Sequence, residues 1–153
     1  MNIVFRSTLK GLHFLAQPVL GFALHNSRRS RVMVIVDGEI LLIKAAFGKQ
    51  KWSLPGGGMH RGEDQYRAAA RELQEETNVV IEPDQFGLAG EVRLPKKKRW
   101  PVANIHFFEC RLAEKPPTKI HRPLEILEIG WFPLTRLPED RSETVDVGIG
   151  LIY

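Results

Sequence analysis

Three glutamates crowd one short stretch of the sequence, shortly downstream of three consecutive glycines. Glu72, Glu75 and Glu76 are spaced i, i+3 and i+4, so a helix would carry all three carboxylates on one face. Like charges placed in this way repel and destabilise an isolated helix unless a cation neutralises them. Carboxylate oxygens are ligands that suit Mg²⁺ or Mn²⁺. The stretch therefore predicts a helix that binds a divalent metal ion.

The alternative interpretation is a solvated acidic helix face, which Glu-x-x-Glu-Glu alone would favour. The residues around it reverse that preference, because they match the signature G-x5-E-x7-R-E-U-x-E-E-x-G-U, in which U is aliphatic. The matching residues are Gly57, Glu63, Arg71, Glu72, Leu73, Glu75, Glu76 and Val79. By this signature the chain resembles the Nudix hydrolase family. Asn78 replaces the last signature glycine, and because asparagine tolerates a positive φ, we expect the turn to survive.

The resemblance extends beyond this segment to about residues 31–140. The stretch Trp-x-Leu-Pro-Gly-Gly-Gly at 52–58 and the stretch Trp-Phe-Pro-Leu at 131–134 both resemble parts of a Nudix domain. The resemblance implies an α/β (α+β) fold, an α/β/α sandwich in which a mixed β-sheet lies between helices. The pattern of elements in the sequence agrees with this architecture.

Apolar runs and turn residues predict the individual elements. Asp37-Gly38 is a strong hairpin signal between two β-branched runs. Asp64 is a candidate N-cap and Asn78 a candidate helix end. We expect strands at 32–36, 40–43, 52–54, 88–93, 104–111 and 127–132, helices at 64–77 and 140–152, and loops at 96–98 and 116–117.

Length and composition indicate one domain. A chain of 153 residues can bury one core, and its 26% of charged residues is ordinary for a globular protein. Cys110 is the single cysteine, so no internal disulfide can form and a cytoplasmic location is expected. We interpret residues 1–30 as an N-terminal arm or a helix that packs on the domain, and residues 31–153 as the Nudix domain. Membrane or partner contact through the basic and apolar arm is the minority alternative.

The resemblance implies a role for each signature residue. The metal ligands would be the Gly57 carbonyl oxygen and the carboxylates of Glu72, Glu75 and Glu76, with Glu63 supporting the cluster. Arg71 would hold a glutamate in place by a charge-assisted hydrogen bond, the alternative being a surface ion pair.

The implied reaction is hydrolysis of a diphosphate, with Mg²⁺ as the cofactor and Mn²⁺ as a substitute. An anionic nucleophile must approach anionic oxygens, and bound Mg²⁺ cancels that repulsion and lowers the pKa of bound water. A carboxylate then takes the proton. Glu125, Glu76 and Glu128 are the candidates, with Glu125 ranked slightly first, and ordinary exposed charge is the alternative for Glu125 and Glu128.

Specificity lies outside the signature segment. Lys98 and Trp100 combine charge with a ring that can stack on a base, Lys51 and Trp52 form a second such pair, and Arg93 is a further candidate. A solvated basic loop and a core position for Trp52 are the alternatives. Pro95, sixteen residues beyond Val79, resembles a proline of ADP-ribose-type members.

We therefore expect a nucleoside diphosphate derivative as substrate: ADP-ribose, a nucleotide sugar or a nucleoside triphosphate. The net charge of +4 favours such polyanions. No stable nucleic acid partner is expected, and a homodimer is compatible with the sequence. The alternatives are an RNA 5′-end pyrophosphohydrolase and a non-catalytic Nudix-like nucleotide-binding module, although such modules usually lose signature carboxylates and this chain retains all four.

Overall fold

The computed structural model describes residues 27–94 and 103–153. Within these two ranges, six strands form one mixed sheet, and two α-helices and a short 3₁₀-helix accompany it. Each strand and both helices that the sequence predicts are present. The elements are β1 (Ser27–Val36), β2 (Glu39–Ala45), β3 (Trp52–Ser53), α2 (Gln65–Thr77), η1 (Pro83–Gln85), β4 (Gly87–Leu94), β5 (Ala103–Arg111), β6 (Ile126–Pro133) and α3 (Glu143–Ile152).

The strands run in the order β3-β2-β1-β5-β4, and β6 pairs with β2. β1 and β5 are parallel, whereas the other pairs are antiparallel. The β1–β2 turn contains Asp37 and Gly38, with φ angles of 48° and 76°. Positive φ at both central residues matches the twist of a two-residue hairpin, as Asp-Gly predicts.

β1 begins at Ser27, earlier than the predicted start at Val32. The extra residues are polar, so they carry no β-strand signal of their own. They are held in the sheet by β5, where Ser27 pairs with Ala103 and Arg29 pairs with Ile105. The early start of β1 is therefore a tertiary effect.

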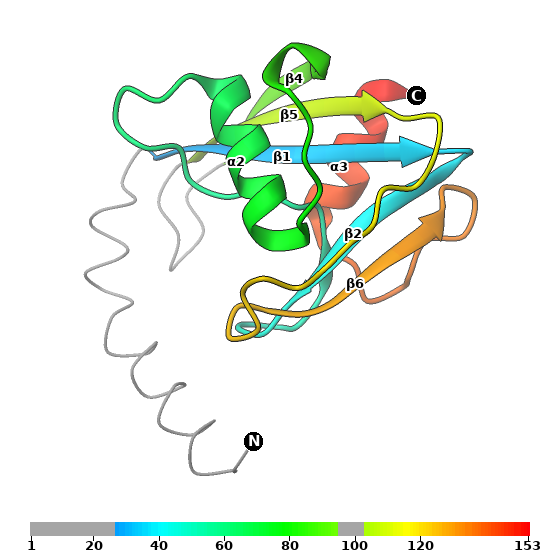
Figure 1. Ribbon diagram of the computed structural model, residues 1–153. Coiled ribbons are helices and arrows are strands. Elements are labelled where there is room, and N and C mark those ends of the chain that lie inside the picture. Colours follow the sequence, from blue (N-terminus) through cyan, green and yellow to red (C-terminus); the bar gives the residue numbers. More distant parts are fainter. Residues whose placement is uncertain (1–26, 95–102) are drawn as a thin grey trace, which may run out of the picture.

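The two α-helices cover opposite faces of the sheet, with α2 in front of β1 and α3 behind it (Figure 1). Alternate residues of β1 supply both cores. Val32 and Val34 pack with the α2 residue Leu73 in one buried cluster. Met33 and Ile35 pack with the α3 residue Val145 in the other. The predicted α/β/α sandwich is confirmed.

The sheet forks beside β1. β6 occupies one edge of β2, so β1 and β3 must share the other edge, and β1 pairs with β2 only near the hairpin. The glycine loop, residues 55–59, fills the space that this leaves. It bonds along β1 like a strand, from Val32 N to Pro55 O at 2.9 Å and from Ser30 N to Gly57 O at 2.9 Å. The fork thereby fixes the glycine loop against the central sheet.

Among the described residues, no helix is both long and apolar enough to cross a membrane. Several predictions fall elsewhere in the chain. The N-terminal arm up to residue 26, the loop at 96–98, and the residues Pro95, Lys98 and Trp100 lie outside the described residues.

Candidate active site

α2 begins and ends where its capping residues predict. Asp64 Oδ1 accepts hydrogen bonds from Tyr66 N at 3.0 Å and Arg67 N at 3.2 Å, which satisfies two free donors of the first turn. Asn78 adopts the left-handed conformation with φ 65°, so it performs the role of the signature glycine that it replaces. The helix therefore presents its glutamates from a defined position.

The Glu72 carboxylate packs against the glycine loop. A Cβ atom added at Gly57 would lie 2.7 Å from Glu72 Oε2, a distance that real Cβ contacts do not show. Glycine at this position thus leaves room for the carboxylate beside the backbone. Glu72 itself is 8% exposed. A glutamate from α2 and the loop backbone consequently share one buried corner.

Arg71 organises the acidic side chains. Its guanidinium binds Glu63 through two hydrogen bonds, of 2.7 Å from Nε and 2.9 Å from Nη2. It also donates to Glu72 Oε1 at 2.8 Å and to the Gly58 carbonyl at 3.0 Å. The hydrogen bonds from Arg71 lower the pKa of Glu63 to about 2. Arg71 therefore fixes the carboxylates of Glu63 and Glu72 at the same time.

Glu76 is a buried carboxyl bonded to the glycine loop. Its side chain accepts from Gly56 N at 2.8 Å, and the residue is 9% exposed. Burial raises the pKa of Glu76 to about 7, against the opposing effects of the Gly56 hydrogen bond and of Arg31. A buried carboxyl whose ionised form is disfavoured is a group that a nearby cation would hold ionised.

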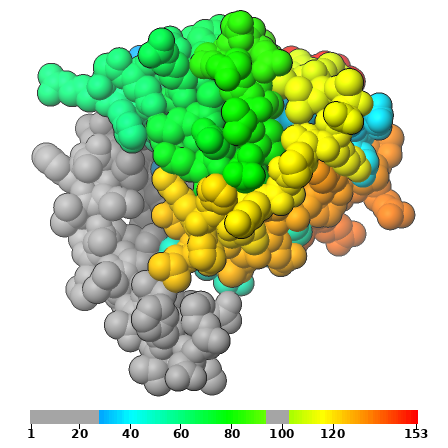
Figure 2. Space-filling model, in the orientation of Figure 1, coloured from blue at the N-terminus to red at the C-terminus, as the bar shows by residue number. Residues whose placement is uncertain are grey.

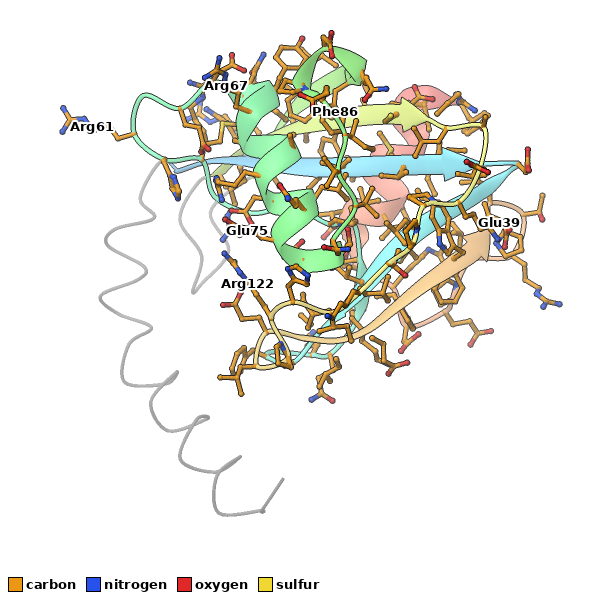
Figure 3. The ribbon with its side chains drawn as sticks, viewed as in Figure 1. Glu39, Arg61, Arg67, Glu75, Phe86 and Arg122 are labelled. Carbon is orange, nitrogen blue, oxygen red and sulfur yellow. The ribbon has the colours of Figure 1, made fainter. Side chains whose placement is uncertain are left out.

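Arg122 closes the cluster from the β5–β6 connection. Its Nη2 binds Glu75 Oε2, and Figure 3 shows the two side chains meeting. The connection is anchored on the end of α2 by a 2.9 Å bond from Lys119 N to Thr77 O. Figure 2 shows the surfaces of α2 and of this connection in contact on one face of the molecule. Arg71 therefore pairs with Glu63 and Glu72, and Arg122 pairs with Glu75.

The donor set fits a hard divalent cation. Three carboxylates and a carbonyl beside them offer oxygen ligands only, and Glu76 would gain by pairing with positive charge. Within residues 27–94 and 103–153, however, no three acidic, histidine or cysteine side chains already converge on one point. Glu75 is held by Arg122 and, at 3.4 Å, by Arg71. An ion at this point would compete with these two arginines for Glu75.

The three candidate bases differ in their surroundings. Glu76 is buried against the glycine loop, whereas the Glu125 and Glu128 side chains are each 55% exposed. Glu125 lies 3.3 Å from Arg122, which itself contacts Glu75. Glu128 lies on β6 and pairs with Lys44 at 3.6 Å. Glu125 is therefore connected to the cluster through one arginine.

The predicted substrate residues are spread over other elements. Lys51 donates to the Arg141 carbonyl at 3.3 Å, and Arg93 is exposed on the outer strand β4. Trp52 is 9% exposed in the α3-side core, where its ring meets Phe132 edge-on at 4.7 Å between centroids. The structure thus brings the signature residues together and leaves these three apart from them.

Three arginines near the signature carboxylates were missed as site residues. Arg122 is 47 residues from its partner Glu75, and nothing in the sequence signals that contact. Arg29 and Arg31 lie on β1, where Glu72 attracts both guanidinium groups. Their i, i+2 spacing was available as a signal, since alternate strand residues share a face. The spacing carries this information only if β1 begins before Val32.

Comparison with known domain families matches residues 26–147 to the NUDIX domain. An RNA pyrophosphohydrolase from Rhizobium meliloti is 33% identical over 106 residues, which cover 58% of this chain and 62% of that relative. The chain thus spans less than two thirds of the length of this relative. These similarities agree with the signature that the glycine loop and α2 display.

Two solved structures share the fold. A MutT NUDIX hydrolase from Burkholderia pseudomallei superposes with a TM-score of 0.76 at 23% identity, covering 84% of this chain and 99% of that chain. A bifunctional NMN adenylyltransferase/ADP ribose pyrophosphatase from Francisella tularensis, complexed with AMP and a Mn ion, has a TM-score of 0.67 at 20% identity. That match covers 94% of this chain and 46% of that chain.

Proposed function

The chain belongs to the Nudix family, and on that basis we propose that it is a hydrolase that splits the diphosphate linkage of a nucleotide. The observation that carries this proposal is the packing of Glu72 and Glu76 against the glycine loop. A solvated acidic helix would leave its carboxylates exposed, but these two are buried against the glycine loop. Non-catalytic modules usually lose signature carboxylates, and this chain retains all four.

The residues that would hold a divalent ion are Glu72, Glu75, Glu76 and the Gly57 carbonyl. Bound Mg²⁺, or Mn²⁺ in its place, would supply the positive charge that lets water approach phosphorus and would lower the pKa of that water. Arg71 keeps Glu72 oriented by a hydrogen bond to Oε1, and Glu63 in turn keeps Arg71 oriented. The Mn ion in the Francisella tularensis structure supports Mn²⁺ as a substitute.

Glu125 is our preferred proton acceptor. A general base must be ionised and must reach the attacking water. The Glu125 side chain is half-exposed and is linked through Arg122 to Glu75, whereas Glu128 is paired with Lys44 and Glu76 is buried. Arg122 contacts both Glu75 and Glu125, so it can orient Glu125 beside the proposed ligands.

The preferred substrate is a small nucleoside diphosphate derivative such as ADP-ribose, a nucleotide sugar or a nucleoside triphosphate. The ADP ribose pyrophosphatase activity in the name of the Francisella tularensis protein supports this class. The second candidate is an RNA 5′ end, which the similarity to an RNA pyrophosphohydrolase favours. Salt separates them, because RNA contacts to several phosphates weaken steeply as salt rises.

Glutamine substitution tests the proposed metal site. Glu75→Gln and Glu76→Gln should each abolish Mg²⁺-dependent phosphate release, because a ligand oxygen loses its charge while the side-chain volume is kept. Circular dichroism and the melting temperature should show an intact fold. Glu114→Gln, at an exposed position, is the matched control and should retain activity. Unchanged activity in both test variants would rule out the proposed ligand set.

A substrate panel then decides the class. Nucleoside triphosphates, ADP-ribose, nucleotide sugars, dinucleoside polyphosphates and 5′-triphosphate RNA are compared with Mg²⁺ and with Mn²⁺ at low and moderate salt. The product shows which phosphorus is attacked. Preference for RNA, with turnover that falls steeply with salt, would favour the second candidate over the first.

A further inference from the structure

Arg29 and Arg31 place two guanidinium groups on one face of β1. They continue the line of Met33 and Ile35, whose side chains form the α3-side core, toward the open end of the strand. Their register partners on β5 are Ile105 and Phe107, which belong to the same core. Two charged side chains thus occupy positions that are apolar farther along the strand.

The two side chains are short of partners. Arg31 Nη1 donates to the Gly56 carbonyl, but the Nε atoms of both arginines are buried and have no hydrogen-bond acceptor among the described residues. Among the described residues, no carboxylate lies within ion-pair distance of either guanidinium. A buried donor without an acceptor is destabilising. An anion at this point would remove that destabilisation.

The charges around the pair point in the same direction. Burial lowers the pKa of both arginines, and the neighbouring Arg29 charge adds to the effect on Arg31. Arg31 bonds the Gly56 carbonyl and Glu76 accepts from the Gly56 amide, so the pair lies beside the proposed metal ligands, and Glu72 attracts both guanidinium groups. Arg71 and Arg122, in contrast, are already bound to glutamates. Among the described residues, Arg29 and Arg31 therefore remain available to a ligand beside these carboxylates.

We propose that Arg29 and Arg31 bind one phosphate of the substrate diphosphate, beside the carboxylates that hold the other. Guanidinium groups match phosphate oxygens with paired N–H donors, which a lysine cannot do. The inference rests on the proposed function, since it names the phosphate-binding part of the same site. The two arginines are positioning residues: they orient the diphosphate and exchange no proton with it.

The test measures phosphate binding without metal. Inorganic pyrophosphate is titrated into the EDTA-treated protein by calorimetry. Arg29→Gln should weaken binding by about tenfold or more, because a charge-assisted hydrogen bond is lost. Arg31→Lys keeps the charge and loses the fork, so a smaller loss is expected. Arg67→Gln removes an equal charge from an exposed position on α2, where the side chain points away from the site (Figure 3), and should bind as the wild type does.

The same variants are titrated with Mn²⁺ alone. Mn²⁺ affinity that is retained or raised, together with weaker pyrophosphate binding, supports the inference. It is overturned if the wild type binds no pyrophosphate without metal, if Arg29→Gln binds it like the wild type, or if Mn²⁺ and pyrophosphate affinity fall together. Hydrolysis is assayed separately. A wild type that binds pyrophosphate through these arginines but hydrolyses no diphosphate would refute the proposed function and leave this inference standing.

Discussion

The two helices that cover the sheet have opposite character. α2 buries Glu72 and Glu76 beside its apolar residues, whereas α3 buries Val145 and Gly148. A Cβ atom added at Gly148 would lie 3.0 Å from Leu54 and 3.1 Å from Met33, so α3 is fitted closely to apolar neighbours. α3 thus packs for stability, whereas α2 buries charge that the proposed metal site uses.

The largest expected effect concerns the pH dependence of the metal-free protein. The folded-state pKa of Glu76 is about 7, above the ordinary 4.5, so the unfolded chain ionises first as pH rises. Stability should fall between pH 4.5 and 7 and stay lower above it, by up to about 3 kcal/mol. Glu76→Gln should lack this decline. Chemical denaturation of both proteins in EDTA from pH 4 to 8 measures it.

Saturating Mg²⁺ is the control for that experiment. A bound cation favours the ionised form of Glu76, so the decline of wild-type stability with pH should disappear when the metal is present. Parallel pH curves for the wild type and Glu76→Gln in EDTA would contradict the contrast between the helices. They would show that ionising the buried Glu76 on α2 costs no stability.

Gly57→Ala should separate activity from stability on the α2 side. The added methyl group displaces the Glu72 carboxylate, and misplacing a ligand by its surroundings costs about 10–100-fold in metal affinity. Mn²⁺ titration should therefore show a loss near the upper end of that range, with a small change in melting temperature. Gly58→Ala is the matched control, because a Cβ there meets nothing within 4 Å. Equal affinities for the two variants would refute the packing argument.

Arg71 and Arg122 should have opposite effects on metal binding. Arg71→Gln releases Glu63 and Glu72 and should weaken Mn²⁺ binding by about tenfold. Arg122→Gln frees Glu75 and should tighten it by a few-fold, since a competing cation is removed. Calorimetric Mn²⁺ titrations compare them at equal ionic strength. Weaker binding in both variants would show that Arg122 orients Glu75 instead of competing for it.

The smallest effects are expected on α3. Gly150→Ala should stabilise the protein by about 0.5–1 kcal/mol, because alanine has the higher helix propensity and the site is open. Gly148→Ala should gain less or lose stability, since its neighbours must move aside. Denaturant unfolding measures both, and Mn²⁺ affinity should be unchanged. Equal stabilisation would mean that the α3 core is loosely packed.

Local sequence signals were enough to predict α2 and the first hairpin. Asp64 caps α2 through its side chain, and Asn78 and the Asp37-Gly38 turn act through their backbone conformation, so all of them specify local structure without help from distant residues. The glutamates at i, i+3 and i+4 likewise needed only helical geometry. Elements and ligand candidates that depend on neighbouring residues were therefore predictable.

Contacts between distant segments were not predictable. Ser27 to Arg31 belong to β1 because β5 and the glycine loop pair with them, and their polar side chains give no strand signal. Arg122 reaches Glu75 through a long connection whose path depends on Thr77 and on β2. Pairing of this kind is decided by the assembled fold.

The parallel pairing of β1 with β5 also bears on how the protein folds. Ser27 pairs with Ala103, a separation of 103 − 27 = 76 residues, so a long loop must close before this pairing can form. Such non-local contacts slow folding, whereas α2 can form from its own capping signals. We expect α2 to form early, before β1 has paired with β5 and packed against it. The catalytic geometry would then be completed only in the last stage of folding, and partly folded chains would bind metal poorly.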